Sequence, residues 1–193
     1  MTSPAPVAHH KGLSPLAGSL RVALVTASDS RTPDTNDGGR LLRRLIEEAG
    51  FAVASEVLLE EEPTALRDAV VRLAADSDAV IITGGTGIGP RDRTPDAVGP
   101  LFERRLPGFG ELFRMLSYQD IGPAAMLSRA DAGVIGRALV FLLPGSPAAV
   151  ALAVRRLIAP ELAHAIGQLR RETTHRPDQH PDHHHGPGHH HGR

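Results

Sequence analysis

At 193 residues, of which 41% are hydrophobic, the chain is long enough for one globular domain with tails. Its formal net charge of −1 argues against a nucleic-acid-binding face or an anionic-membrane surface, so we expect neither partner. The absence of cysteine excludes disulfides, thiol catalysis and thiolate metal sites. No signal-peptide pattern and no run of about 18 apolar residues is present, so we expect a cytoplasmic protein.

Composition divides the chain into three segments. Residues 1–18 mix Pro, Ser, Ala and His without periodicity, which predicts a disordered lead-in. Residues 19–171 alternate strand-like and helical patterns and form the expected domain. Residues 172–193 hold eight of the eleven histidines among Pro, Gly and Asp, which also predicts disorder. Histidine at this density can hold Zn²⁺ or Ni²⁺ loosely, although the tail can equally be without function.

The first predicted strand is the apolar run from Leu20 to Ala27. Ser28 and Asp29 follow at its carboxyl end, where open α/β sheets place their ligands. After a polar turn, Asn36 or Asp37 is expected to cap a helix that Gly50 terminates.

The second predicted strand runs from Phe51 to Leu59 and leads to three glutamates, Glu60 to Glu62. Pro63 or Thr64 is expected to open the next helix. Three acids at a helix start can be explained by their favourable interaction with the helix dipole, without a catalytic role.

The third predicted strand, Ala79 to Ile82, precedes a glycine loop. In Thr83-Gly-Gly-Thr-Gly-Ile-Gly89, four of seven positions lack a side chain, which permits positive φ and close approach of a ligand. We expect Thr94 to cap the following helix and Pro95 to be its first residue. A strand, a glycine loop and a helix start together direct free N–H groups at one place, which suits a phosphate.

The glycine loop matches no general nucleotide motif. No Gly-Lys-Ser/Thr follows it, so it is not a P-loop, and its third glycine comes one place early for a dinucleotide fingerprint. Arg91 and Arg93 suit an anion, whereas Asp92 between them would repel one by ~4 kcal/mol at ~4 Å and an effective dielectric of ~20. A bridging Mg²⁺ would remove that repulsion; alternatively, Asp92 pairs with an arginine or caps a turn.

The second half of the domain is predicted to contain mostly helices. The pattern favours a helix over 95–105, a turn over 106–111, and a helix whose apolar side is either core or a subunit contact. That apolar side consists of Leu112, Phe113, Met115 and Leu116. Two further helices are expected over 148–157 and 160–171.

One more buried strand is predicted from Ala138 to Leu143. Pro144 and Gly145 follow it, and Ser146-Pro147 repeats the cap-then-proline pattern of Thr94-Pro95. Alternating strands and helices predict a three-layer α/β/α sandwich with a mostly parallel sheet. If this strand and the third are parallel neighbours, their two loops face one crevice.

Five motifs taken together resemble the molybdopterin-binding Mog/MoaB family of molybdenum cofactor biosynthesis. In chain order they are Thr83-Gly-Gly-Thr-Gly87, Arg91-Asp92-x-Thr94-Pro95-Asp96-Ala97, Leu106-Pro-Gly-Phe-Gly-Glu111, Leu127-Ser-Arg129 and Leu143-Pro-Gly-Ser-Pro147. The resemblance covers roughly 20–169, with the family's order and spacing.

The resemblance implies Mg²⁺-dependent transfer of AMP from ATP to the terminal phosphate of molybdopterin, with release of pyrophosphate. It places two catalytic, metal-linked acids at Asp92 and Glu61; the family usually has Asp at the second position, and Glu60 or Glu62 takes that position if the register shifts. The expected nucleotide and phosphate ligands are Thr83, Gly84, Gly85, Thr86, Gly87 and Arg91. The expected molybdopterin ligands are Ser28, Asp29, Ser128, Arg129, Pro144, Gly145 and Ser146.

The resemblance also implies a homotrimer or homohexamer. Two other functions stay open at this point. One is a non-catalytic molybdopterin-binding protein of the same family, in which Glu60 to Glu62 form only a solvated helix start. The other is a metal-storage or metal-delivery protein that acts through the histidine-rich tail.

Overall fold

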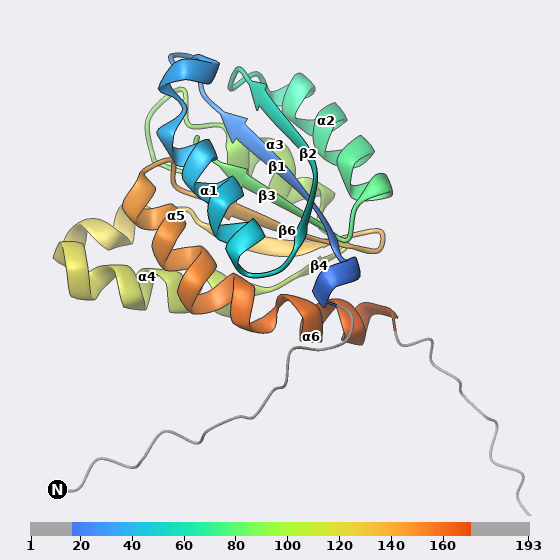
Figure 1. The fold of residues 1–193 in the computed structure, drawn as a ribbon. Coiled ribbons are helices and arrows are strands. Elements are labelled where there is room, and N and C mark those ends of the chain that lie inside the picture. Colours follow the sequence, from blue (N-terminus) through green and yellow to red (C-terminus); the bar gives the residue numbers. More distant parts are fainter. Residues whose placement is uncertain (1–16, 171–193) are drawn as a thin grey trace, which may run out of the picture.

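The structure is a computed structural model that describes residues 17–170; the predictions for residues 1–16 and 171–193 lie outside this range. Its centre is a six-stranded sheet with the strand order β2-β1-β3-β6-β5-β4 (Figure 1). Four strands are mutually parallel, whereas β5 runs antiparallel to β6, and β4 runs antiparallel to β5. The strands are β1 (Arg21–Ala27), β2 (Ala52–Leu59), β3 (Ala79–Thr83), β4 (Arg104–Arg105), β5 (Asp131–Ile135) and β6 (Ala138–Leu143).

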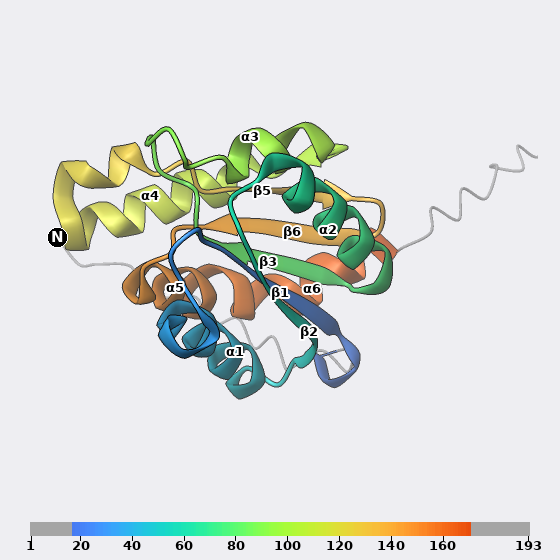
Figure 2. The same ribbon diagram turned by 90° about the horizontal axis from the view of Figure 1, so that it is seen from above.

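Helices cover both faces of the sheet, as Figure 2 shows from above. One face carries α1 (Asp37–Glu48), α4 (Pro107–Ile121), α5 (Pro147–Ala153) and α6 (Ala159–Arg170), and the other carries α2 (Pro63–Asp76) and α3 (Thr94–Val98). Short 3₁₀ turns are η1 (Ala17–Ser19), η2 (Pro33–Thr35), η3 (Gly99–Leu101) and η4 (Gly122–Leu127). A π-helical turn, η5 (Val154–Ile158), joins α5 to α6.

Successive residues of each central strand enter two separate cores, as the side-chain alternation of a strand requires. In β3, Ile81 packs with α1, α4, α5 and α6, whereas Val80 and Ile82 pack with α2 and α3. All five residues of β3 are buried. The predicted three-layer α/β/α sandwich with a mostly parallel sheet is therefore confirmed. No helix between residues 17 and 170 is long and apolar enough to cross a membrane.

Two predictions for the second half of the domain are wrong. The helix expected over 95–105 ends at Val98, because Pro100 lacks the N–H that would continue the ladder; the chain then forms η3 and pairs with β5 as β4. The turn expected over 106–111 already belongs to α4, which has Pro107 as its first residue. The two helices expected over 148–157 and 160–171 are present, the first as α5 with η5 and the second as α6.

The apolar side predicted for α4 is divided between core and surface. Phe113 is buried, but Leu112 and Met115 are 47% and 55% exposed. Gly110 lies so close to the Ala130 carbonyl that a Cβ there would stand 2.6 Å from its oxygen. The helix therefore turns its glycine and Phe113 toward the sheet rather than the full leucine and methionine stripe.

Two of the three predicted helix caps are confirmed. The Asn36 side chain accepts a hydrogen bond from Gly39 N at 3.0 Å, and Ser146 Oγ accepts one from Ala149 N at 3.3 Å. Thr94 was expected to cap α3 but is its first helical residue; the capping position belongs to Arg93, which makes no side-chain cap.

Candidate functional site

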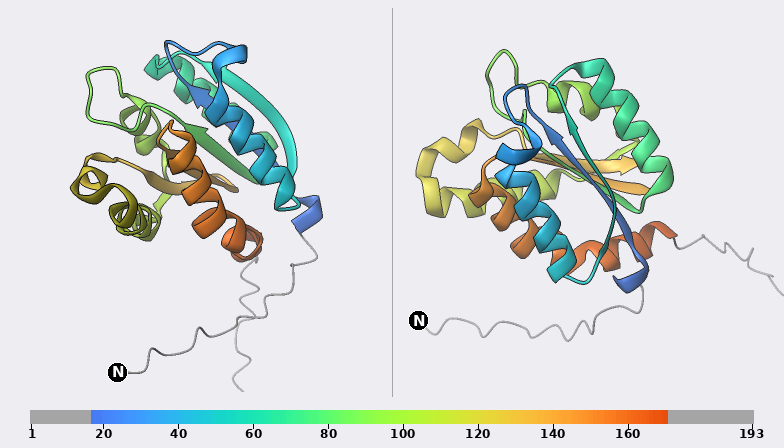
Figure 3. Two further views of the ribbon diagram at one scale, coloured as in Figure 1. Left: turned by 60° about the vertical axis from the view of Figure 1, so that its left-hand side comes forward. Right: turned by 45° about the horizontal axis from the view of Figure 1, so that its top comes forward.

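The carboxyl ends of four parallel strands meet at one edge of the sheet. In the strand register, Ala27 lies beside Leu59, Thr26 beside Thr83, and Thr83 beside Leu143. The segments that follow these strands therefore leave the sheet side by side, and the loop after β3 extends beyond the edge (Figure 3). This is the position at which open α/β sheets bind ligands.

The loops after β3 and β6 are in direct contact. Gly84 N donates to the Leu143 carbonyl at 2.9 Å, and Thr83 Oγ1 donates to the Pro144 carbonyl at 3.1 Å. Gly84 has a φ of 108°, and a Cβ there would collide with the Ala27 carbonyl oxygen, so only glycine fits. β3 and β6 are thus parallel neighbours, as the shared crevice required.

The segment after β1 is fastened to the loops beside it. Ser28 N donates to the Leu59 carbonyl at 2.8 Å, and Ser28 Oγ accepts from Arg31 N at 3.3 Å. Arg31 Nη2 then donates to the Gly145 carbonyl at 2.8 Å. Arg31 therefore links the segment that carries Ser28 and Asp29 to Gly145, which was predicted from a different part of the chain.

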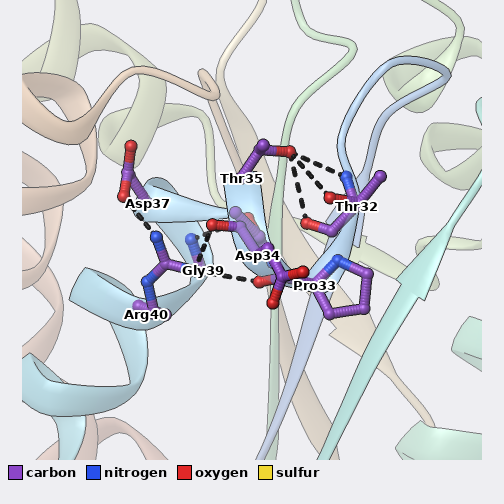
Figure 4. A network of polar contacts seen from close by, with 8 residues as sticks. Thr32, Pro33, Asp34, Thr35, Asp37, Gly39 and Arg40 are labelled. Atoms are coloured by element: carbon purple, nitrogen blue, oxygen red, sulfur yellow. Dashed lines mark hydrogen bonds and ion pairs between the residues drawn. The ribbon is translucent and has the colours of Figure 1, made fainter.

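A second set of hydrogen bonds shapes the turn that leads from this segment into α1 (Figure 4). Thr32 N donates to Thr35 Oγ1 at 2.9 Å. Arg40 Nη1 donates to the carbonyls of Pro33 and Asp34 at 2.9 and 3.0 Å. These contacts fix the conformation of η2 and join it to the first turn of α1.

Three carboxylates and one arginine line a pocket of about 280 Å³ at this edge. They are Asp29, Glu61, Asp92 and Arg91, which come from the segments after β1, β2 and β3. Asp29 Oδ1 accepts from Glu61 N at 2.8 Å, and its Oδ2 lies 3.8 Å from Arg91 Nη1. Because Arg91 is largely exposed, solvent screens this pair and its charge stays accessible to an anion.

Asp92 has one oxygen committed to its own loop. Its Oδ2 accepts from Gly89 N at 2.8 Å, so the interpretation that Asp92 closes a turn holds for this oxygen. A Cβ at Gly87 or Gly89 would stand 2.7 Å from the same oxygen, which explains why both positions are glycine. The side chain nevertheless lines the pocket, where its second oxygen can serve a ligand.

Glu61 is the perturbed acid of the site. Burial raises the pKa of its carboxyl above the ordinary value, and the charges of Asp29 and Asp92 raise it further; the Arg93 N–H and the Arg91 guanidinium act in the opposite direction. Glu61 Oε2 is buried and has no hydrogen-bond partner among the described residues. A cation bound by this carboxylate would relieve the repulsion among the three acids.

The two neighbouring glutamates have other positions. Glu62 is the N-cap of α2, where its carboxylate accepts from Thr64 N and Ala65 N at 3.0 and 2.6 Å. These N–H groups lower the pKa of Glu62. Glu60 lies on an adjoining hollow with Glu62 and Pro63. The favourable interaction of an acid with the helix start therefore accounts for Glu62, whereas the Glu61 side chain lines the pocket.

A metal ion fits the pocket only if the protein and a bound substrate both supply its ligands. No group of three His, Asp or Glu side chains within residues 17–170 forms a metal-binding cluster. Mg²⁺, however, is usually held by one or two carboxylates together with substrate phosphates. Glu61 and Asp92 meet that requirement, and the unpartnered Glu61 Oε2 is the observation that favours them.

Arg129, predicted as a molybdopterin ligand, uses its side-chain donors in hydrogen bonds to the glycine loop and to Asp96. Its Nε donates to the Gly87 carbonyl at 2.7 Å, its Nη1 donates to both Asp96 oxygens at 3.0 and 2.9 Å, and its Nη2 donates to the Asp92 carbonyl. Arg129 N also donates to the Thr86 carbonyl at 2.9 Å. Arg129 lines a second hollow of about 300 Å³ beside the acidic pocket and holds the shape of the loop between them.

Ser128 does not line the acidic pocket; its Oγ accepts from Ala130 N at 3.3 Å. Ser146 caps α5 through its oxygen, which leaves its O–H free to donate to a ligand. Two residues of the site, Asp96 and Thr94, were not predicted to bind a ligand or take part in catalysis. Their motif placed both near the loop, but only the fold reveals their partners.

Comparison with known proteins gives a consistent result. Residues 23–164 match the family model described as "Probable molybdopterin binding domain". Molybdenum cofactor biosynthesis protein B of Bacillus subtilis is 48% identical over 156 residues, which covers 79% of this chain and 92% of the relative.

Solved structures agree with this match. A crystal structure of molybdenum cofactor biosynthesis protein B is 46% identical, with a TM-score of 0.76, and the match covers 79% of this chain and 97% of that one. The tungsten cofactor synthesizing protein MoaB from Pyrococcus furiosus is 30% identical, with a TM-score of 0.71 and coverage of 78% and 97%.

Proposed function

This chain belongs to the molybdopterin-binding MoaB/Mog family of molybdenum cofactor biosynthesis proteins, and from that premise we propose that it transfers AMP from ATP to the terminal phosphate of molybdopterin. The observation that carries the proposal is the meeting of Glu61 and Asp92 beside the glycine loop, at the edge of the sheet where the loop after β6 begins.

Nucleotidyl transfer needs positioning and charge neutralisation more than a reactive side chain. A phosphate oxygen of molybdopterin attacks the α-phosphorus of ATP, and the bond from that phosphorus to pyrophosphate breaks. Glu61 and Asp92 would hold Mg²⁺, which when bound neutralises phosphate charge. Arg91, exposed at the pocket mouth, and the amides of residues 83–87 would orient the phosphates of the nucleotide.

The molybdopterin side of the pocket falls to the segments after β6 and β1. Pro144 and Gly145 adjoin the glycine loop, and Ser28 and Asp29 line the pocket with residues 89–92. The Ser146 O–H would donate to the pterin phosphate. Arg129 acts on the loop rather than on the ligand, since the loop and Asp96 already take its donors.

A non-catalytic molybdopterin-binding protein is the second candidate. It is favoured by the commitment of Asp92 to Gly89 N and by the lack of a complete metal-binding cluster in the described part of the chain. A third candidate, metal storage through the tail at 172–193, concerns residues that the structure does not describe. The homotrimer or homohexamer stays a prediction, which sedimentation analysis tests.

The deciding experiment is release of pyrophosphate from the purified protein with molybdopterin, ATP and Mg²⁺. We expect release that requires all three and that stops on chelation of the metal. Binding of molybdopterin without release would instead select the non-catalytic candidate. Deletion of residues 172–193 should leave turnover unchanged, and a collapse of turnover would favour the third candidate.

A further inference from the structure

Two buried side-chain oxygens have no hydrogen-bond partner in the part of the chain that the structure describes. They are Glu61 Oε2 and Thr94 Oγ1. Buried polar groups in folded proteins are nearly always paired, so each exception calls for an explanation. Here both exceptions belong to one place.

That place is defined by Gly85. A Cβ at this position would stand 2.6 Å from Glu61 Oε2 and closer still to Thr94 Oγ1, so the two oxygens point into the same small volume. Gly85 has a φ of 62°, in the left-handed region that favours glycine. Backbone conformation and space together keep this volume free of a side chain.

Thr94 is completely buried, and its hydroxyl does not serve the helix that begins there. As the first residue of α3, it does not occupy the capping position, and its backbone N donates to the Gly85 carbonyl at 3.1 Å. The backbone thus fixes Thr94 beside Gly85 while the hydroxyl faces Glu61. Valine has the same β-branched shape without the hydroxyl, so packing alone does not require a hydroxyl here.

An unpaired buried hydroxyl and an unpaired carboxylate oxygen both lower the stability of the ligand-free protein. Such a local cost is expected at functional sites, where residues serve a bound state rather than the free one. The two groups are chemically complementary, because a hydroxyl donates and a carboxylate oxygen accepts.

We propose that Thr94 is a positioning residue for Glu61, and that its hydroxyl donates a hydrogen bond to Glu61 Oε2 in the state in which the Glu61 carboxylate holds a divalent cation. The inference rests on the proposed role of Glu61 in holding the metal. It assigns Thr94 the outer-shell function of orienting a metal ligand, a function whose loss typically lowers metal affinity ~10- to 100-fold.

The test uses Mn²⁺ as the probe, with binding to the full-length protein measured by electron paramagnetic resonance in the absence of nucleotide. Thr94→Val, which removes only the hydroxyl, should weaken Mn²⁺ binding at least ~10-fold. Thr94→Ser, which keeps the hydroxyl, should bind within ~3-fold of the unmodified protein. Adding Thr94→Val to Glu61→Gln should cause no further loss, because the hydroxyl acts through that carboxylate.

Denaturant unfolding of the ligand-free protein supplies the second readout. Thr94→Val should be as stable as the unmodified protein or more stable, because an unpaired hydroxyl leaves the interior. A less stable or unfolded variant would show that the hydroxyl serves the free fold, and unchanged Mn²⁺ affinity would show that it does not orient Glu61. Either result overturns the inference, as does an unmodified protein that binds no Mn²⁺. Mn²⁺ binding without pyrophosphate release would overturn adenylyl transfer alone and leave the role of Thr94 standing.

Discussion

The starts of α3 and α5 present the same local sequence and use it differently. Each follows a parallel strand and a glycine-containing loop, and each has a hydroxyl residue directly before proline, Thr94-Pro95 and Ser146-Pro147. Ser146 caps its helix through Ala149 N. Thr94 instead lies inside its helix, with its hydroxyl buried and unpaired.

The difference comes from what lies opposite each hydroxyl. Ser146 is exposed, so its nearest hydrogen-bonding partner is the helix itself. Thr94 faces Gly85 and the Glu61 carboxyl, which approaches from the end of a different strand. A hydroxyl residue before proline therefore predicts a helix cap, but the residues that surround the hydroxyl determine whether it forms one.

The largest expected effect is that of replacing Asp92, which lies in the loop before α3 and is proposed to hold the metal. Asp92→Asn should lower the rate of pyrophosphate release at least ~100-fold, which is what one well-placed electrostatic group supplies. Affinity for ATP should change far less, because an amide oxygen can still accept the Gly89 N–H that shapes the loop. Turnover and ATP binding are measured on the same preparation. An equal loss in both would remove the proposed metal role from Asp92.

Substitution of one glycine in each of the two loops, Gly85 and Gly145, compares the helix starts by their effect on the free energy of unfolding. Gly85→Ala should destabilise the ligand-free protein by ~1–3 kcal/mol, since it adds a Cβ at positive φ against Glu61 and Thr94. Gly145→Ala in the loop after β6 is the matched control. Its nearest obstacle would be the Gly84 Cα at 3.4 Å, so we expect a change of less than ~1 kcal/mol. Denaturant unfolding measures both, and similar losses would contradict the special geometry of Gly85.

The two hydroxyls can be separated by one substitution each. Ser146→Ala should cost ~1 kcal/mol of unfolding free energy because the cap of α5 is lost. Ser146→Asn, which retains a good capping side chain, should recover most of it. Thr94→Val should show no such cost. If the two truncations destabilise equally, the contrast between the helix starts is wrong.

The smallest expected effect concerns pH and the adjacent acids Glu61 and Glu62. The pKa of Glu61 is raised by folding, so its contribution to stability is present below its unfolded-state pKa and lost as pH rises through the folded-state value. The pKa of Glu62 is lowered, so its contribution is present above its unfolded-state pKa and lost as pH falls through the folded-state value.

Unfolding free energies between acidic and neutral pH measure this contrast in metal-free buffer. Glu61→Gln should remove a decline that accompanies rising pH, and Glu62→Gln should remove a decline that accompanies falling pH. Changes of the same sign for both variants would mean that Glu61 is not the buried acid of the pocket.

Much of the architecture could be predicted from the sequence because its signals are local. The strand at Ala138–Leu143 was bounded correctly by its apolar run, and the helix caps at Asn36 and Ser146 by their side chains. The helix expected over 95–105 failed for two reasons: Pro100, a local signal, ends it, and Arg104 pairs with Val134, which is far away in the chain.

The same distinction applies to the site. The meeting of the loops after β3 and β6 follows from parallel strand order, which the alternation of elements indicated. The positions of Thr94 and Arg129 could not be inferred, because their partners lie on other elements. Arg129 resembles a ligand-binding cation in the sequence, yet in the fold it contacts Asp96 and two loop carbonyls.

Because of these contacts with Arg129, the glycine loop depends on residues outside itself for its shape. Residues 84–92 do not constitute a portable module, since a guanidinium delivered from the antiparallel margin of the sheet anchors them through Gly87 and Asp92. Grafting the loop and its acid onto another scaffold would omit that anchor. A successful transplant would have to bring Arg129 and Asp96 along with it.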